Sequence, residues 1–234
     1  VMNLASKVLC NEEDVIICEA PSFIGSLNTF RSIKTRLRGI SMEEDGMNML
    51  ELEQALKEEP NARMIYTIPN FQNPSGITMS FEKRKKMYQL AKQYGVIILE
   101  DNPYGDLRVS GTHVPAIKSF DEDGIVIYAG SFSKVISPGK QADDVHTNIL
   151  AQMICNTLMT DYDYDGHLEK LRTIYRKRTE LMIHLIEEHL VPHGITYHKA
   201  EGGLFIWCTL PENINMLDFC KKSAEKKVCV VPGN

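Results

Sequence analysis

Four short apolar segments punctuate the chain. They cover residues 15–18 (V-I-I-C), 64–68 (M-I-Y-T-I), 96–99 (V-I-I-L) and 125–129 (I-V-I-Y-A). None alternates between apolar and polar positions, and continuous apolar runs of this length are typical of parallel strands that are covered on both faces. Helical patterns lie between them. The pattern therefore predicts an α/β domain in which a mostly parallel sheet is sandwiched between helices.

Two of the intervening stretches carry helix start signals. Asn48 and Glu51 have the spacing of a capping box at the start of an L-E-L-E-Q-A-L-K pattern. Ser80 is placed to cap a helix over residues 81–94, and Gly95 is placed to end it.

The last third of the chain has a different pattern. Residues 168–190 form one long helical pattern, followed by the short segments I-T-Y-H-K and L-F-I-W-C-T-L, a helical L-D-F-C-K-K-S-A-E-K-K and a final V-C-V-V-P. We therefore expect a large domain over residues 1–165. Residues 166–234 would form a long connecting helix and a smaller α+β domain.

Composition excludes several function classes. The net charge is −5 with acidic and basic residues well mixed, so no basic stripe predicts a nucleic-acid partner. No apolar run reaches membrane-spanning length and no signal peptide is apparent, so no membrane partner is expected. Six cysteines without a C-x-x-C pair indicate a reducing, cytoplasmic compartment, and seven histidines without ligand spacing predict no metal site.

Polar and aromatic residues follow each predicted strand. The segments are E-A-P-S-F-I-G, P-N-F-Q-N-P-S-G, E-D-N-P-Y-G-D and G-S-F-S-K. Ligands of open α/β sheets bind beyond the carboxyl ends of the strands. One edge of the sheet is therefore expected to gather an aromatic ring, an amide, a carboxylate, a phenol, two hydroxyls and an amine. These groups suit a planar, phosphorylated cofactor that carries an aldehyde. The candidates are Phe23, Asn73, Asp101, Tyr104, Ser131, Ser133 and Lys134.

Each candidate alone has an ordinary structural explanation. Asp101 and the N-P-S-G segment are typical of turns, Phe23 of a core, and Lys134 of a solvated surface. Their appearance together, at successive strand ends, favours a cofactor site.

With these motifs the chain resembles the fold-type I pyridoxal-phosphate (PLP) enzymes of the class I and II aminotransferase family. E-A-P-S-F-I-G, N-F-Q-N-P-S-G, L-E-D-N-P-Y-G-D-L and G-S-F-S-K-V-I-S-P-G are most similar to the branch of aromatic and 2-aminoadipate aminotransferases. That branch also resembles the C-terminal half of MocR-type transcription regulators. The resemblance extends to G-G-L-F-I-W and the final V-P-G, and it implies an aspartate aminotransferase-like fold with pyridoxal 5'-phosphate as cofactor.

The resemblance also implies roles for the central candidates. Lys134 matches the lysine that forms a Schiff base with the cofactor and then moves a proton between the substrate Cα and the cofactor C4′. Asp101 matches the carboxylate that keeps the pyridine nitrogen protonated. Asn73 and Tyr104 match the residues that hydrogen-bond the 3′ oxygen of the ring.

The remaining candidates match the periphery of the cofactor. Phe23 matches the aromatic residue that stacks on the ring, and Ser131 and Ser133 match hydroxyls of the phosphate loop. Three family features have no counterpart here: a small-residue phosphate loop before the first helix, a phosphate-pairing arginine after S-P-G, and a carboxylate-binding arginine near the C-terminus.

A segment is expected to be missing from the middle of the sequence. The family continues after S-P-G with an apolar strand, whereas this chain continues with K-Q-A-D-D. Loss of a core strand would leave the backbone groups of its neighbours unpaired. We therefore expect a gap near residues 139–141, and family segments missing at both ends of the chain.

The resemblance implies an aminotransferase that moves an amino group from an amino acid to a 2-oxo acid, acting as a homodimer. Two alternatives use the same residues: a non-catalytic PLP-binding effector domain of a MocR-type regulator, and a PLP-dependent lyase. A winged helix-turn-helix upstream of this chain would favour the regulator. The resemblance also predicts cis peptide bonds at Ala20–Pro21 and Asn73–Pro74, where proline makes the cis form accessible.

Overall fold

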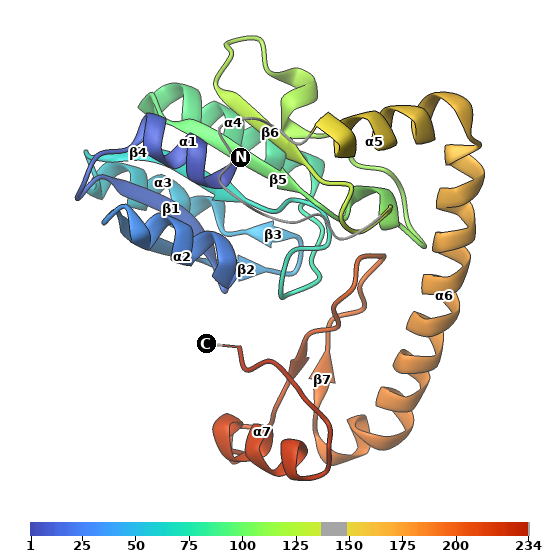
Figure 1. Cartoon of the computed structure of the whole chain (residues 1–234). Coiled ribbons are helices and arrows are strands. Elements are labelled where there is room, and N and C mark those ends of the chain that lie inside the picture. The colour runs from blue at the N-terminus through green and yellow to red at the C-terminus, as the bar shows by residue number, and fades with distance from the viewer. Residues whose placement is uncertain (137–148, 234) are drawn as a thin grey trace.

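A six-stranded sheet lies between helices in the computed structural model, which describes residues 1–136 and 149–233 (Figure 1). The strand order is β3-β2-β1-β4-β5-β6. The strands are β1 (Val15–Ala20), β2 (Arg36–Glu43), β3 (Gly46–Met47), β4 (Ala62–Thr67), β5 (Ile97–Asn102) and β6 (Val126–Gly130). The helices are α1 (Met2–Leu9), α2 (Ile24–Ser32), α3 (Met49–Glu58), α4 (Phe81–Tyr94), α5 (Ile149–Asp161), α6 (Tyr164–His189) and α7 (Met216–Glu225).

The four predicted strands are confirmed as β1, β4, β5 and β6, and they pair in parallel. β2 pairs in parallel with β1 and antiparallel with the short β3. The apolar pattern did not predict β2, because its sequence R-L-R-G-I-S-M-E is mostly polar and only Ile40 in it is fully buried. The predicted α/β architecture with a mostly parallel sheet is therefore confirmed.

Each face of the sheet has its own hydrophobic core, since successive side chains of a strand point to opposite faces. Val15 and Ile17 pack with residues of α3 and α4 on one face. Ile16 and Cys18 pack with residues of α1 and α2 on the other. Both faces are thus covered, which is the reason that the strands read as continuous apolar runs.

The helix signals in the sequence are largely confirmed. The Asn48 side chain accepts hydrogen bonds from the backbone N–H groups of Leu50 and Glu51. Glu51 does not return the bond to Asn48 as a capping box requires; its carboxylate accepts from the backbone N–H of Ser41 at 2.9 Å. Ser80 caps α4, and Gly95 ends it in the left-handed conformation.

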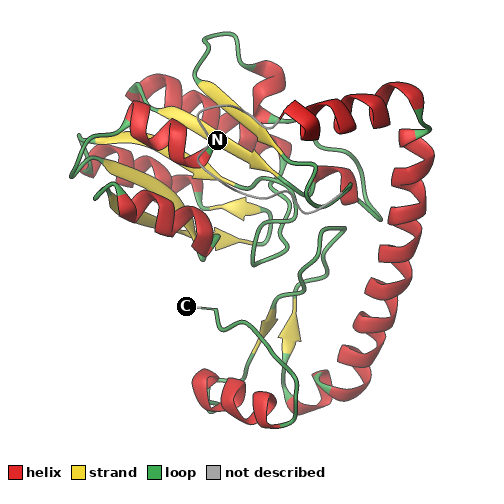
Figure 2. Ribbon diagram, viewed as in Figure 1, coloured by secondary structure: helices red, strands yellow, loops and turns green. Residues whose placement is uncertain are grey.

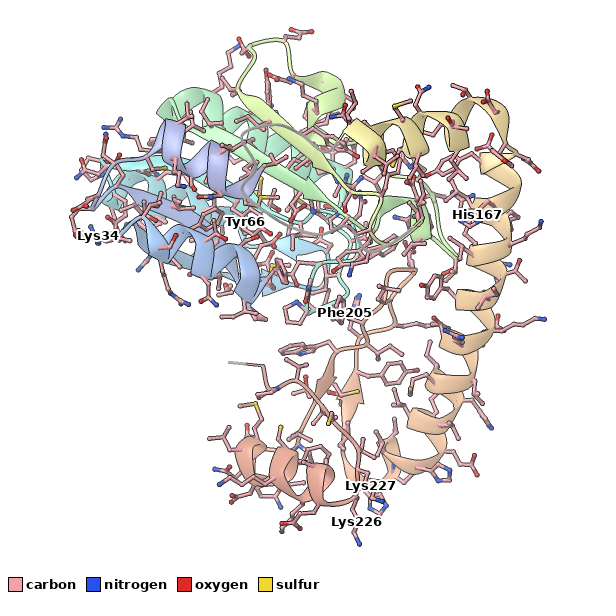
Figure 3. All side chains as sticks on the ribbon, viewed as in Figure 1. Lys34, Tyr66, His167, Phe205, Lys226 and Lys227 are labelled. Atoms are coloured by element: carbon pink, nitrogen blue, oxygen red, sulfur yellow. The ribbon has the colours of Figure 1, made fainter. Side chains whose placement is uncertain are left out.

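The last third contains the long α6, a hairpin of β7 (Thr196–Tyr197) and β8 (Cys208–Thr209), and α7 (Figure 2). The loop between β7 and β8 reaches back to the carboxyl end of the six-stranded sheet. The Gly203 N–H donates to the Leu107 carbonyl at 3.2 Å. A Cβ on Gly203 would lie 2.5 Å from Cβ of Phe71, so only glycine permits this approach. Phe205 consequently lies beside the end of the sheet (Figure 3).

Both predicted cis peptide bonds, Ala20–Pro21 and Asn73–Pro74, are confirmed. The predicted gap near residues 139–141 lies outside the described residues. Cys10 and Cys18 are buried, as expected of small apolar residues, whereas Cys229 is exposed. Among the described helices, none combines the length and apolarity that crossing a membrane requires.

A fully buried arginine connects α4 to the loops at the carboxyl end of the sheet. The Arg84 side chain has no exposed area, and burial lowers the pKa of its guanidinium to about 10, although the nearby Glu100 opposes this effect. Its N–H groups donate at 2.8–3.3 Å to five oxygens. These are the carbonyl oxygens of Pro69, Met79, Val114 and Pro115 and the amide oxygen of Asn70.

Replacing this arginine is expected to destabilise the fold strongly. Arg84→Ala would leave buried oxygens without donors, at a cost on the order of 3–5 kcal/mol of unfolding free energy. Urea denaturation measures the loss. Arg36→Ala is the matched control, because Arg36 forms an ion pair with Glu59 in which its own side chain is half exposed. Equal, small losses for the two variants would contradict the role assigned to Arg84.

Candidate active site

The loops that carry the candidate residues start at one edge of the sheet. In the parallel register Asp101 pairs with Ala129, and Asn102 pairs with Gly130. Thr67, the last residue of β4, pairs with Glu100. The loops after β4, β5 and β6 therefore leave the sheet side by side, as parallel strands require.

Asp101 is a buried carboxylate with a donor on one oxygen. The Tyr66 hydroxyl donates to Oδ2 of Asp101 at 2.8 Å, and the Ser26 hydroxyl donates to the Tyr66 oxygen at 2.9 Å. Figure 3 shows Tyr66 within the sheet, where its ring meets Phe30 edge-on at 5.3 Å. Burial raises the pKa of Asp101 to about 6, although the bond from Tyr66 opposes the rise. No residue in the described part of the chain donates a hydrogen bond to Oδ1.

Asn73 and Tyr104 form a second pair at this edge. The Asn73 amide donates to the Tyr104 hydroxyl at 3.3 Å. The Tyr104 ring is buried and meets Phe205 edge-on with centroids 5.8 Å apart. Burial raises the pKa of the Tyr104 phenol; the bond from Asn73 lowers it, and the charge of Asp101 raises it further. The Tyr104 hydroxyl thus lies close enough to Asp101 to be affected by its charge, and Asn73 is linked to it through a hydrogen bond.

The other four candidates occupy loop and helix-end positions. Phe23 precedes α2, and its ring lies over Gly25, where a Cβ would come within 2.6 Å of the ring. Ser131 is exposed, and its hydroxyl accepts from the backbone N–H of Ser133 at 3.2 Å. Lys134 lies in an exposed turn after β6. Within residues 1–136 and 149–233 its amine has no hydrogen-bond or ion-pair partner.

The turn that carries Lys134 is held from α6. Nε2 of His167 lies 2.7 Å from the carbonyl oxygen of Val135, and it must carry the hydrogen because a carbonyl only accepts. The Val135 side chain packs against Leu107 and Leu168. Figure 3 shows His167 on the side of α6 that faces the sheet. α6 thereby fixes the backbone directly after Lys134.

A second buried carboxylate, Glu19, lies near the end of β1. It accepts from the Thr67 hydroxyl at 2.6 Å, the Ile68 N–H at 3.1 Å and the Gln72 amide at 3.0 Å. Burial raises its pKa to about 7; these three bonds oppose the rise, and the charge of Asp101 adds to it.

A pocket of about 630 Å³ opens on the other flank of the Asp101–Tyr104 loop. Asn102 and Gly105 line it, but none of the seven candidate residues does. Its arginines already have partners: Arg172 bonds the Asp106 carbonyl at 2.9 Å and lies 3.5 Å from Glu169. We therefore place the candidate site at the strand ends and not in this pocket. No cluster of three potential metal ligands occurs among the described residues.

Comparisons with known proteins identify the family of the chain. The family model of aminotransferase class I and II matches residues 1–137. The chain belongs to this family. It is 38% identical to aromatic-amino-acid aminotransferase 1 of Thermococcus litoralis, covering 99% of this chain and 61% of that protein. It superposes on crystalline kynurenine aminotransferase of Pyrococcus horikoshii, in complex with PMP, with a TM-score of 0.93 at 33% identity, covering 99% and 63% of the two chains.

A regulator is also among the relatives. The uncharacterized HTH-type transcriptional regulator YisV of Bacillus subtilis is 30% identical over 99% of this chain, which covers 51% of the regulator. The chain thus spans between half and two thirds of these three proteins. The similarity to the Pyrococcus aminotransferase confirms the predicted aspartate aminotransferase-like fold of this family member.

The sequence analysis did not predict several residues that lie at the site. Tyr66 lies inside an apolar strand and was therefore counted as core, and Ser26 had no local signal. Phe205 and His167 come from distant segments. Glu19 could have been found, because it stands at the end of the first predicted strand in E-A-P, as Asp101 does in E-D-N-P.

The stability of the cofactor-free protein is expected to fall as pH rises. A carboxyl whose pKa is higher in the folded than in the unfolded state favours folding while it is protonated, and this contribution is lost on ionisation. For Asp101 and Glu19 the loss falls between about pH 4 and pH 7, given folded pKa values of about 6 and about 7. Asp101→Asn, which keeps an acceptor for Tyr66, should be more stable than wild type at pH 8 by on the order of 1–3 kcal/mol.

Thermal unfolding of both proteins at pH 4 and pH 8 measures this effect. The two should be nearly equal at pH 4, where both side chains are neutral, and Asp106→Asn, at an exposed position, should change neither value. An equal offset at both pH values would show that ionisation of Asp101 is not the cause.

Proposed function

We propose that this protein is a PLP-dependent aminotransferase that moves an amino group from an amino acid to a 2-oxo acid. The observation that carries the proposal is the buried Asp101 carboxylate at the end of β5, with Oδ2 held by Tyr66 and Oδ1 left for a ligand. A buried carboxylate is costly unless it is paired, so a cationic partner such as a protonated ring nitrogen would stabilise it.

The surrounding groups fit pyridoxal 5'-phosphate by their chemistry. The Asn73–Tyr104 pair supplies donors for a phenolate-like oxygen, and Phe23 supplies an aromatic face. Ser131 and Ser133 lie in the turn after β6 with a free amine, Lys134, directly after them. Hydroxyls for a phosphate, an amine for an aldehyde and a carboxylate for the ring nitrogen are the groups that this cofactor needs.

Three residues of the chain have separate roles in this proposal: Asp101, Tyr66 and Lys134. Bound PLP supplies an electron sink for the negative charge that develops at the substrate Cα. Asp101 keeps the ring nitrogen protonated, and Tyr66 keeps Asp101 oriented. Lys134 would hold the cofactor through its amine and would carry the proton to and from the substrate Cα.

The remaining features of the protein are proposed by resemblance to its family. We propose a homodimer, a cytoplasmic location, and a division into a large domain over residues 1–165 and a connecting helix with a small domain over 166–234. α6, which begins at Tyr164, and the hairpin after it are consistent with this division. The docking of Phe205 against Tyr104 means that the smaller part contributes to the site.

The similarity to the regulator YisV keeps one alternative open. A PLP-binding effector domain would use the same cofactor residues without completing transamination. The two functions differ in whether an amino acid converts the bound cofactor to its amine form and releases a 2-oxo acid, and this outcome can be followed by absorbance.

Lys134 is expected to be the point of covalent attachment. Borohydride reduction of the PLP-loaded full-length protein, followed by peptide mapping, should place the label on Lys134. Lys118 is the matched control, because it is exposed and already bonds Asp121 at 2.8 Å. A label on any other lysine would overturn the assignment.

The reaction itself is tested by a half-reaction screen with a panel of amino acids. Conversion of the cofactor with stoichiometric release of a 2-oxo acid supports the aminotransferase. Binding of PLP without conversion by any amino acid would favour the regulator, and release of ammonia would favour a lyase.

A further inference from the structure

We propose that Glu19 is the positioning residue that sets the place of Asn73 against the cofactor, by bonding Gln72, the residue before Asn73 in the loop 68–79. This inference rests on the proposed function, since it concerns the contact of Asn73 with the 3′ oxygen of PLP. It is carried by the hydrogen bonds of a carboxylate that the proposed mechanism does not otherwise use.

Hydrogen bonds within the loop hold its shape, and Arg84 holds its two ends at Pro69, Asn70 and Met79. The Gln72 N–H donates to the Ile77 carbonyl at 2.9 Å, and the Gly76 N–H donates to the Gln72 carbonyl at 2.6 Å. At its end the Met79 N–H donates to the Pro69 carbonyl at 2.8 Å. These bonds fix the shape of the loop, but its place relative to β1 depends on contacts outside it.

Gln72 provides that external contact, and the orientation of its amide follows from its partners. Its Oε1 accepts from the backbone N–H of Ser75 at 2.8 Å, and a backbone N–H can only donate. Nε2 therefore donates, and it does so to Oε2 of Glu19 at 3.0 Å and to the Pro21 carbonyl at 2.8 Å. Gln72 and Ser75 stand on either side of Asn73, so the bond from Glu19 holds Asn73 between two anchored residues.

Glu19 suits this task because its own place is fixed. It lies in β1, is 2% exposed, and also accepts from Thr67 and Ile68 at the end of the adjacent β4. A buried carboxylate must be met by donors, so loss of any one of them is costly and the arrangement is rigid. The same Gln72 amide bonds Pro21, two residues before Phe23. One pair, Glu19–Gln72, thus links the loop of Phe23 to the loop of Asn73.

The test uses two variants. The first is Glu19→Gln, and the second is the double variant that exchanges the acceptor at position 19 with the donor at position 72. In Glu19→Gln one oxygen still accepts from Thr67 and Ile68, but the new NH₂ faces the NH₂ of Gln72, and two donors repel. The double variant Glu19→Gln/Gln72→Glu restores a donor–acceptor pair and keeps the acceptor for Ser75. It loses the bond to Pro21 and places a carboxylate oxygen against the Pro21 carbonyl, so part of the effect of Glu19→Gln, and not all of it, is expected to be recovered.

Asp121→Asn is the matched control. The Asp121 side chain has no exposed area and accepts from the backbone N–H groups of Ile125 and Val126 at 3.1 Å. It stands before β6, at the amino end of the parallel strands, whereas Asn73 lies beyond their carboxyl ends. This variant therefore introduces the same carboxylate-to-amide change without touching the loop.

Three readouts separate positioning from general stability. Hydrogen exchange of the cofactor-free protein should become about tenfold faster in residues 69–79 of Glu19→Gln. In the PLP-loaded protein the cofactor should bind about tenfold more weakly. The pH at which its visible absorbance changes should also rise, because the 3′ oxygen anion loses the donor of Asn73. The double variant should recover part of all three effects, and Asp121→Asn should show none of them.

The outcomes are distinguishable from failure of the proposed function. If wild type does not bind PLP, the proposed function fails and this inference fails with it. If wild type binds PLP and Glu19→Gln leaves the exchange of residues 69–79 and the absorbance transition unchanged, Glu19 does not position Asn73. A double variant no better than Glu19→Gln would likewise overturn the inference.

Discussion

Buried carboxylates at the carboxyl edge of the sheet are the constraint on which the rest of this structure depends. Glu19 ends the buried part of β1, and Glu100 and Asp101 lie near the end of β5. A carboxylate removed from water is unstable unless donors meet it. Here the donors come from the loops and strands beside it, so satisfying the carboxylates also fixes the loops.

Each carboxylate organises a different part of the edge. Glu100 accepts at 2.9 Å from the backbone N–H groups of Ile117 and Lys118 and thereby holds the segment before β6. Glu19 holds the loop of Asn73. Asp101 has Tyr66 on one oxygen only. Asp101 thus differs from Glu19 and Glu100, whose oxygens each accept a hydrogen bond, and this difference supports the proposal that Asp101 meets the cofactor.

Sequence reasoning predicted the strands and the edge at which chemistry gathers, because both depend on local patterns. Continuous apolar runs identified four strands, and the residues directly after them identified Asp101 and Lys134. It did not predict β2, whose sequence is mostly polar and in which only Ile40 is fully buried. It also missed Tyr66, Phe205 and His167, since their contacts join segments far apart in the sequence and no local pattern encodes them.

The central claim is that Asp101 meets the ring nitrogen of PLP, and nitrogen-15 NMR tests it most directly. With PLP labelled at the ring nitrogen, the full-length protein should give the chemical shift of a protonated pyridinium. Asp101→Ala should move the signal to that of neutral pyridine, because the stabilising carboxylate is gone, whereas Asp106→Ala should leave it unchanged. A neutral ring nitrogen in the wild-type protein, or a pyridinium signal that persists in Asp101→Ala, would contradict the account.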